Sequence, residues 1–364
     1  MSPLQGLKVV ELARILAGPW IGQTLADLGA EVTKIESPVG DDTRTWGPPF
    51  IEHQGDTSAA YFYSCNRGKK GLRADLKTPE GIAAVKALVH DADIFIENFK
   101  VGWLAKYGLD YASLHALNPR LIYCSVTGFG QTGPLSHLPG YDFLLQGMSG
   151  LMSVTGEPDG PPQKVGVAVT DIVTGLYGTI GIMAAIEQRH TNGKGQHIDM
   201  SLLDCATALL ANQNMNFLAS GQSPTRMGNA HPNICPYDVF GTADGHVILA
   251  VGNDGQFKRC CDVLGLTDTV HDGRFETNSL RVKYRGDLMP ILSKAILAWS
   301  SDDLLANFSL NNVPAGPINS VGNNLTSEHA KARGLVVEPE GVKGVRTPIT
   351  FSNAALKLDH SAPH

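Results

Sequence analysis

The stretch that decides the fold lies near the N-terminus, where Leu7-Lys8-Val9-Val10-Glu11-Leu12 and Glu31-Val32-Thr33-Lys34-Ile35-Glu36 are two short runs rich in β-branched residues. Between them, residues 20–28 follow Pro19 and precede Gly29, which are typical residues for a helix start and a helix stop. A strand, a helix and a second strand in this order form a parallel pair with a right-handed crossover. The stretch therefore predicts a βαβ unit.

The alternation of strands and helices continues to about residue 130. Further strands are predicted at 72–76, 93–97 and 121–126, and helices at 79–91 and 103–117. Such alternation is typical of a doubly wound, Rossmann-like α/β domain. Because ligands in open α/β sheets bind beyond the carboxyl ends of the strands, we expect a site at the loops 14–18, 98–102 and 127–130.

The remainder of the chain has a different pattern. A long apolar helix is predicted from 171 to about 189, and its many small residues indicate close packing against another backbone. A second helix is expected at 202–218. Residues 226–325 have the pattern of a smaller α+β unit, in which the turn Ala243-Asp244-Gly245 joins two apolar runs into a hairpin.

The composition argues against several classes of function. The 364 residues carry a net charge of −6 without a basic run, which gives nucleic-acid binding little electrostatic support. The strongly apolar stretches are shorter than the roughly 20 residues of a membrane span. Twelve histidines form no H-E-x-x-H pattern and six cysteines form no C-x-x-C pair, so no metal site is predicted. Reduced, buried thiols and an N-terminus without signal-peptide features indicate the cytoplasm.

One glycine-rich segment resembles a nucleotide motif. Gly128-Phe129-Gly130-Gln131-Thr132-Gly133 matches G-x-G-x-x-G after a predicted strand. A dinucleotide site also needs a helix that opens at the last glycine, and here Pro134 and Pro139 follow instead. We interpret the segment as a loop at the edge of a ligand site.

Asp171 opens the long apolar helix and has two interpretations. Its carboxylate could cap the helix by accepting backbone N–H groups. Alternatively, the helix dipole keeps it ionised, and it acts as a nucleophile on an activated carbonyl while N–H groups at the helix end stabilise the oxyanion. The sequence leaves both interpretations open.

Several other polar side chains also have two interpretations each. Arg44 is either a surface residue or an anion contact, and Tyr141 either belongs to the core or donates from its hydroxyl. His231 is equally ambiguous. A local basic cluster is either a solvated surface or a phosphate site, and it consists of Arg67, Lys69, Lys70 and Lys77.

Taken together, these segments resemble the class III CoA-transferases, also called the CaiB–BaiF family. The resemblance runs from Leu4 to the C-terminus and rests on short motifs in a fixed order. They are residues 7–12, Ala17-Gly18-Pro19, residues 28–36, Glu97-Asn98-Phe99, residues 118–122, Gly140-Tyr141-Asp142 and residues 191–196. Each motif is weak alone, and their common order and spacing make the resemblance specific.

The resemblance implies that Asp171 is the nucleophile of a covalent mechanism. It would attack a donor acyl-CoA to form a mixed anhydride, and CoA would return to form an aspartyl-CoA thioester before transfer to an acceptor acid. Acyl-CoA is thus a substrate, and no permanent cofactor, ATP or metal is implied. Matching positions imply CoA contacts at Ile15, Leu16, Ala17, Ala74, Lys77, Asn98, Phe99 and Lys106.

Two positions separate this chain from other branches of the family. The racemase branch has a histidine at the position of Tyr141, and tyrosine is a poor base at neutral pH. An α-methylacyl-CoA racemase is therefore the alternative, and CoA transfer is the main hypothesis. The formyl-CoA:oxalate branch usually has glutamine in place of Leu16, so oxalate is not favoured.

Within the family, the chain most resembles the dicarboxylate enzymes, the succinyl-CoA:glutarate CoA-transferases. The resemblance is carried by residues 40–50, 127–134, 228–231, 252–253 and 313–319. The free end of a dicarboxylate needs a cation or several N–H donors. The candidates for binding the acid are Arg44, Tyr141, His231, Gly252 and Gly255, with Arg226 and Arg281 as further cations.

The family also implies an assembly, an interlocked-ring homodimer. By this resemblance, a large CoA-binding α/β domain spans 1–200 and a linker helix spans 201–225. A small α+β domain spans 226–325, and residues 326–364 return to the large domain. No nucleic-acid or membrane partner is implied.

Overall fold

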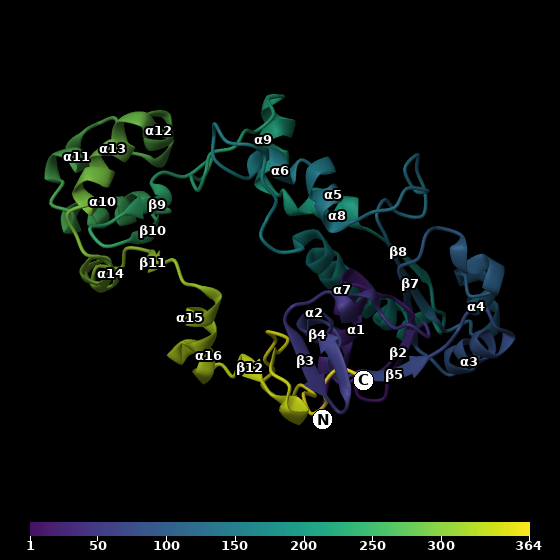
Figure 1. The fold of residues 1–364 in the computed structure, drawn as a ribbon. Coiled ribbons are helices and arrows are strands. Elements are labelled where there is room, and N and C mark those ends of the chain that lie inside the picture. The colour runs from purple at the N-terminus through teal and green to yellow at the C-terminus, as the bar shows by residue number, and fades with distance from the viewer. The chain divides into compact units, whose positions relative to one another are not determined.

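A computed structural model describes all 364 residues, which form two compact units (Figure 1). The large unit comprises residues 1–152, 164–223 and 328–364. The small unit comprises residues 153–163 and 224–327. This division departs from the expected one in two respects. Residues 201–223 belong to the large unit instead of forming a separate linker, and the short segment 153–163 belongs to the small unit.

A six-stranded parallel sheet forms the centre of the large unit. Its strands, in spatial order, are β5 (Lys70–Arg73), β2 (Glu31–Glu36), β1 (Lys8–Glu11), β6 (Ile94–Glu97), β7 (Ile122–Thr127) and β8 (His197–Ser201). The predicted βαβ unit is confirmed by the parallel pairing of β1 with β2. The chain leaves β1 toward β2 and β5, and later continues from β6 toward β7 and β8. The order therefore reverses between β1 and β6, and a ligand is expected at this switch point.

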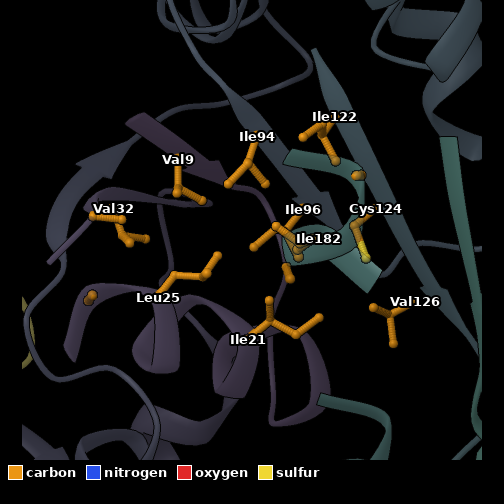
Figure 2. Close-up of a cluster of buried hydrophobic side chains, with 14 of the residues drawn as sticks. Val9, Ile21, Leu25, Val32, Ile94, Ile96, Ile122, Cys124, Val126 and Ile182 are labelled. Carbon is orange, nitrogen blue, oxygen red and sulfur yellow. The ribbon is translucent and has the colours of Figure 1, made fainter. Parts of the chain in front are cut away.

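Helices cover both faces of the sheet. On one face, α1 (Ala17–Asp27) and α7 (Val169–Asn192) pack against the strands, and Figure 2 shows side chains of both helices pointing toward β1, β6 and β7. On the other face, α3 (Pro79–His90) and α4 (Tyr111–Leu117) cover a second apolar cluster around Phe95 and Tyr123.

The small residues of α7 allow close packing against α1. A Cβ atom on Gly175 would lie 3.0 Å from the carbonyl oxygen of Ala17, and one on Gly178 would lie 2.6 Å from the side chain of Ile21. The sequence interpretation of these glycines is thus confirmed. The expectation that every strongly apolar stretch is shorter than a membrane span is not confirmed. Helix α7 is long and apolar enough to span a membrane, with a mean hydropathy of 1.5. Part of α7 is nevertheless buried against the sheet, as Ile182 and Ile186 show.

Several predicted helices differ in their bounds. Helix α1 begins at Ala17 with Leu16 as N-cap, so Pro19 is its third residue and not its first. The predicted helix 103–117 is a 3-10 helix, η2 (Trp103–Tyr107), followed by α4. The predicted helix 202–218 is two helices, α8 (Leu202–Leu209) and α9 (Asn212–Ser220), which are separated by Ala211 at a φ of 42°.

Some elements of the large unit have no clear signal in the sequence. They are η1 (Asp42–Thr45), β3 (Phe50–His53), β4 (Asp56–Ala59), α2 (Ala60–Ser64), α5 (Asp142–Met148) and α6 (Leu151–Val154), the last of which reaches into the small unit. The C-terminal segment adds α16 (Glu328–Ala332), β12 (Val336–Val337), η3 (Pro339–Gly341) and β13 (Gly344–Val345). This segment packs within the large unit, since Lys357 donates its backbone N–H to the carbonyl of Asp27 at 2.7 Å.

The small unit is an α+β unit around its own apolar core. Its antiparallel sheet has the order β11 (Ala315–Pro317), β10 (His246–Ala250) and β9 (Tyr237–Gly241), and the predicted hairpin is confirmed by the pairing of β9 with β10. Its helices are α10 (Asp254–Val263), α11 (Thr267–His271), α12 (Asn278–Lys283), α13 (Arg285–Ile296), α14 (Ser301–Leu310) and α15 (Val321–Thr326).

Candidate active site

A cavity of about 490 Å³ opens in the large unit at the carboxyl edge of the sheet. It is lined by residues 14–17 after β1, residues 98–101 after β6 and residues 126–128 at the end of β7. These are the strand-end loops that the sequence predicted. The wall is completed by residues 138–142 and by Asp171. The cavity therefore lies at the switch point of the sheet and contains a carboxylate.

Asp171 is the third residue of α7, whose N-cap is Ala168. The interpretation of Asp171 as the N-cap is therefore wrong. Burial raises its pKa to about 7, and the negative charge of Asp142 contributes to the rise. The expectation that the helix dipole keeps this carboxylate firmly ionised is also corrected, because burial and a like charge favour the protonated form. A carboxylate with a raised pKa is more basic and hence a better nucleophile.

Asp142 fixes the entry into α7. Its Oδ1 accepts the backbone N–H of Thr170 at 2.8 Å, and its Oδ2 accepts from Nε2 of Gln146 at 2.7 Å. Gln146 is fully buried, and its Oε1 accepts the N–H of Val165 at 2.9 Å. Helix α5 thus holds the segment that leads to Asp171. The sequence contains a signal for this role, because Asp142 belongs to the Gly140-Tyr141-Asp142 motif, although the motif by itself suggests a function only for the tyrosine.

Two glycines bring the β7 loop against the segment before α5. A Cβ atom on Gly128 would lie 2.5 Å from the Cα of Gly140, and one on Gly140 would lie 2.3 Å from the Cα of Gly128. The two backbones therefore pack directly against each other in the cavity wall. No helix follows Gly133, which agrees with the interpretation of the 128–133 segment as a loop.

Asn98 joins the loops that follow β1 and β6. Its Oδ1 accepts the N–H of Arg14 at 3.0 Å, and its Nδ2 donates to the carbonyl of Arg14 at 2.7 Å. Next to it, the ring of Phe99 stacks on that of Trp103, with centroids 4.6 Å apart. At the cavity rim, Asn98 therefore joins the two loops by hydrogen bonds, and the stacked rings of Phe99 and Trp103 lie next to it.

Comparison with known proteins identifies the family. The profile described as CoA-transferase family III matches residues 4–364. The chain belongs to this family. It is 56% identical to the succinate–glutarate CoA-transferase of Agrobacterium fabrum, over 99% of this chain and 92% of that protein. It is 42% identical to the human succinyl-CoA:glutarate CoA-transferase, over 93% of this chain and 77% of that protein.

Solved structures agree with this assignment. The crystal structure of a CaiB/BaiF family protein from Brucella suis is 59% identical and superimposes with a TM-score of 0.90, covering 100% of this chain and 96% of that one. The family that the sequence motifs indicated is thus confirmed, and the chain is a CoA-transferase.

The CoA contacts that the family implies divide into two groups in the structure. Five of them line the cavity together with Asp171, namely Ile15, Leu16, Ala17, Asn98 and Phe99. The other three do not line it. Ala74 is buried after β5, and Lys77 is exposed just before α3. Lys106 is exposed, with its Nζ 4.5 Å from the ring centroid of Trp103.

Tyr141 lines the cavity, and 62% of its surface is exposed. The interpretation of this residue as a core tyrosine is therefore wrong. It is the N-cap residue of α5, directly before Asp142. Its hydroxyl remains a candidate donor to a bound acid.

Arg44 is not a free anion contact. It is buried, and all five of its N–H groups point to protein oxygens. Its closest partner is Glu36, whose Oε1 lies 2.7 Å from Nη2, and the carbonyl of Pro363 accepts a further bond at 3.0 Å. Because no donor is left for a ligand, Arg44 is a structural residue, and both sequence interpretations are wrong.

The basic cluster is also divided. Arg67 and Lys69 are buried, and their charges are matched by Asp27 and Glu11. Neither a solvated surface nor a phosphate site describes these two residues. Only Lys70 and Lys77 remain exposed. The sequence could not show this, because the partner carboxylates precede the cluster by many residues.

The remaining candidates lie in the small unit. Arg281 is fully buried and donates to the carbonyl of Cys235 at 2.8 Å and to Asp254 at 2.7 Å, so it is a core residue and no ligand anchor. Arg226 donates to the carbonyls of Glu157 and Gly160, which ties the segment 153–163 to its unit. Arg281 is thus excluded as a substrate cation, whereas Arg226 is only partly buried and stays a candidate.

His231 and the two glycines also have local partners. Nδ1 of His231 accepts the N–H of Asn233 at 3.0 Å, and burial together with Arg285 lowers the pKa of the ring. Gly252 donates its N–H to Gln256 at 2.8 Å, within the cap of α10, and Gly255 lies in the first turn of that helix. His231 is therefore predominantly neutral at pH 7, and the N–H of Gly252 is already used.

Proposed function

We propose that this CoA-transferase moves CoA from succinyl-CoA to a small dicarboxylic acid such as glutarate, through covalent intermediates on Asp171. The observation that carries the proposal is the position of Asp171, a carboxylate of raised pKa in the cavity at the switch point of the sheet. The names of the relatives from Agrobacterium fabrum and human support the substrate class.

The proposed reaction exchanges acyl bonds on one carboxylate. An oxygen of Asp171 attacks the thioester carbonyl of succinyl-CoA, and CoA thiolate leaves as a mixed anhydride forms. The thiolate then attacks the aspartyl carbonyl of the anhydride, which releases succinate and leaves an aspartyl-CoA thioester. The acceptor carboxylate attacks the aspartyl carbonyl of this thioester, which expels CoA thiolate and forms a second mixed anhydride, now between Asp171 and the acceptor. The thiolate then attacks the acceptor's acyl carbon, and the bond from this carbon to the Asp171 oxygen breaks. The products are the new acyl-CoA and the free carboxylate of Asp171.

The site offers what such a sequence needs. Each step replaces one activated acyl bond by another, so the reaction proceeds without ATP, a metal or a permanent cofactor. Tyr141, at the cavity wall, is our candidate for a hydrogen-bond donor to the acid. Since all six cysteines are free and buried, we also assign the enzyme to the cytoplasm.

The alternative, an α-methylacyl-CoA racemase, is less favoured. The racemase branch has a histidine as the second base, and this chain has Tyr141 at that position, in the cavity wall beside Asp142. Wash-in of deuterium at the α-carbon of a 2-methylacyl-CoA would support a racemase.

The proposal is tested by trapping the intermediate. The enzyme is incubated with labelled succinyl-CoA, treated with hydroxylamine or borohydride, and digested for mass spectrometry. The modification is expected at Asp171, and Asp171→Ala should abolish both trapping and transfer. Glu187→Ala is a matched control, since Glu187 lies exposed on the same helix. Normal transfer by Asp171→Ala would overturn the covalent mechanism.

We further propose that the enzyme is a homodimer. Large apolar side chains are exposed on α7 at Leu176, Tyr177 and Ile180, and on α5 at Phe143 and Leu144. The two helices contact each other, and we treat their exposed apolar side chains together as one candidate surface. Monomers seldom expose apolar patches of this kind. A second copy of the chain is our occupant for this surface, in agreement with the interlocked dimer that the family resemblance implies.

A further inference from the structure

The cavity wall contains a residue in an unfavourable backbone conformation. Ile15 has a φ of 72°, in the left-handed region, although it carries a β-branched side chain. Such a residue clashes with its own backbone there, and the conformation persists only where the surroundings impose it. Ile15 lines the same cavity as Asp171 and is the first residue of the 15–17 segment. The question is what imposes this conformation.

Buried side chains form hydrogen bonds with the backbone of Ile15 and of the nearby Ala13. The N–H of Ile15 donates to both oxygens of Asp41, at 3.3 and 3.2 Å, and the carbonyl of Ile15 accepts from Sγ of Cys65 at 3.4 Å. Lys34 donates to the carbonyl of Ala13 at 2.9 Å. These side chains come from three separate segments of the chain, and Asp41, Lys34 and Cys65 are all buried.

The charges of this group are matched within the protein. Nζ of Lys34 lies 3.0 Å from Asp41 and 3.1 Å from Glu11, and Glu11 is also 2.7 Å from Lys69. Lys69 in turn donates to the carbonyl of Pro19, in the first turn of α1, at 2.9 Å. Burial alone would lower the pKa of Lys34, but Glu11 and Asp41 outweigh it and raise that pKa above its usual value. Lys34 therefore stays charged, whereas burial lowers the pKa of Lys69 to about 8, and the direct contacts among the four groups fix their geometry.

Buried ion pairs are a weak source of stability, because the cost of removing charges from water can exceed their mutual attraction. A connected group of four such side chains, one of which binds the N–H of a strained cavity residue, points to a role in the site. The close packing of Glu11 against α1 agrees with a role in the site. A Cβ atom on Gly22 would lie 1.7 Å from a carboxylate oxygen of Glu11, so α1 leaves Glu11 no room to move.

We propose that Asp41, oriented by Lys34 and Thr43, is a positioning residue that holds the backbone of Ile15 to Ala17 in the conformation that receives acyl-CoA. Asp41 does not line the cavity of the candidate active site, and its hydrogen bonds reach that cavity through Ile15. This inference rests on the proposed function, because the 15–17 segment matters to catalysis only if acyl-CoA binds there. Misplacement of a binding segment by about 1 Å can reduce kcat/KM by up to about 100-fold.

The first test is Asp41→Asn, which keeps the shape of the side chain and removes its charge. The KM for succinyl-CoA should rise by about tenfold or more, with a smaller change in kcat. The matched control is Asp27→Asn. Asp27 is also buried, paired with an arginine (Arg67) and bonded to a backbone N–H, that of Thr347, but it lies outside the cavity. Its substitution should lower the melting temperature and leave the KM unchanged.

A rescue experiment separates positioning from general structure. Glycine adopts positive φ without a steric penalty, so Ile15→Gly should make the hydrogen bonds from Asp41 less necessary for this backbone conformation. The rise in KM caused by Asp41→Asn should therefore be much smaller in the Ile15→Gly background than in the natural chain. An equal rise in both backgrounds would overturn the proposal. So would an equal rise in KM for Asp41→Asn and Asp27→Asn.

Two further measurements keep the result unambiguous. If Asp41→Asn does not fold, Thr43→Val replaces it. Thr43 Oγ1 donates to Asp41 at 2.8 Å, so this substitution removes one hydrogen bond that orients the carboxylate and keeps its charge. For Thr43→Val, a rise in the KM for succinyl-CoA that is smaller than the rise expected for Asp41→Asn supports the proposal. An unchanged KM overturns it. Calorimetric binding of CoA is followed in parallel. Wild-type enzyme that binds CoA without transferring it would reject the proposed function, while the dissociation constants of the variants still test the role of Asp41.

Discussion

At the scale of single residues, Asp171 sets the pH dependence that transfer should show. Burial raises its pKa to about 7, and Asp142 adds to the rise. Because only the ionised carboxylate attacks a thioester, kcat/KM for succinyl-CoA should increase by about tenfold per pH unit below pH 7 and level off above it. Initial rates between about pH 5.5 and 8.5 measure this profile.

The variant Asp142→Asn is the control for this profile. An asparagine can still accept the N–H of Thr170 through its oxygen, but it lacks the charge that contributes to the raised pKa. The midpoint of the profile should therefore move to lower pH. The same midpoint in both proteins would show that another group controls the rate.

The raised pKa of Asp171 also has a consequence for stability. The carboxyl group loses its proton near pH 3.8 in the unfolded chain and near pH 7 in the folded one. Stability therefore falls as the pH rises between these values, and the loss is complete above pH 7. Asp171→Asn should then increase the free energy of unfolding at pH 8 by about 2 kcal/mol, less than the full shift implies because the side chain is partly exposed.

Urea unfolding at two pH values tests this expectation. The gain from Asp171→Asn should be largest at pH 8 and should fade toward pH 4, where both states carry a protonated carboxyl group. A gain that is the same at both pH values would have a cause other than charge.

The sequence identified Asp171 and five cavity-lining positions, because motifs and strand ends are local features. It was wrong about Arg44, since the carboxylates that bind this residue lie on other elements and Pro363 lies at the far end of the chain. Burial of a charge depends on which distant partners the fold brings to it. No local sequence pattern indicates such burial, and for the same reason the sequence does not predict the buried contacts of Asp41 and Lys34.

At the scale of elements, the packing of α7 on α1 couples helix geometry to the cavity. A Cβ atom on Gly175 would lie 3.0 Å from the carbonyl oxygen of Ala17, at the start of α1, where the cavity wall is formed. Gly175→Ala should therefore push the 15–17 segment and raise the KM for succinyl-CoA. Steady-state kinetics and the melting temperature measure the two effects.

Gly181→Ala is the matched control on the same helix. There the new Cβ atom would make an ordinary contact of 3.4 Å with Ile198, and alanine favours a helix over glycine by up to about 1 kcal/mol. This variant should be at least as stable as the natural enzyme, with an unchanged KM. If both variants behave alike, the close contact with Ala17 is unimportant for the cavity.

The elements that the sequence predicted well are those with a strong period. β2 matches its predicted bounds, and α3 begins at Pro79 as expected. The sequence predicts no element in the region 42–64, because its short hairpin and helices are held by contacts with other segments. It also does not predict the break between α8 and α9 at Ala211, since alanine carries no local signal for a positive φ.

At the scale of the whole molecule, the C-terminal segment completes the large unit. Arg67 donates to the carbonyl of Val345 at 2.9 Å, and the buried carboxylate of Asp27 accepts the N–H of Thr347 at 3.0 Å. Lys357 bonds to the backbone of the same aspartate. The family resemblance anticipated this return of residues 326–364. The side chains that hold it, two of the buried charges, could be assigned only from the structure.

The exposed apolar surface of the large unit bears on assembly. Ile180 of α7 is 62% exposed, and Tyr177 and Leu176 flank it on the same helix. Burial of such side chains contributes about 1.5–3 kcal/mol each, so a single copy of the chain in water leaves a considerable driving force unused. The opposite face of α7 packs in the core, and the helix therefore has no other surface on which to bury these side chains within its own unit.

Ile180→Asp tests whether a second copy covers this surface. A charge in the centre of a buried apolar interface is costly, so the variant should sediment as a monomer, or with a dissociation constant raised by at least about 100-fold, while the natural enzyme sediments as a dimer. Leu310→Asp is the control, because Leu310 is 81% exposed and belongs to α14 of the small unit, not to α5 or α7. That variant should remain dimeric. Analytical ultracentrifugation over a range of concentrations distinguishes these outcomes, and a monomeric natural enzyme, or a dimer that tolerates Ile180→Asp, would contradict the proposed assembly.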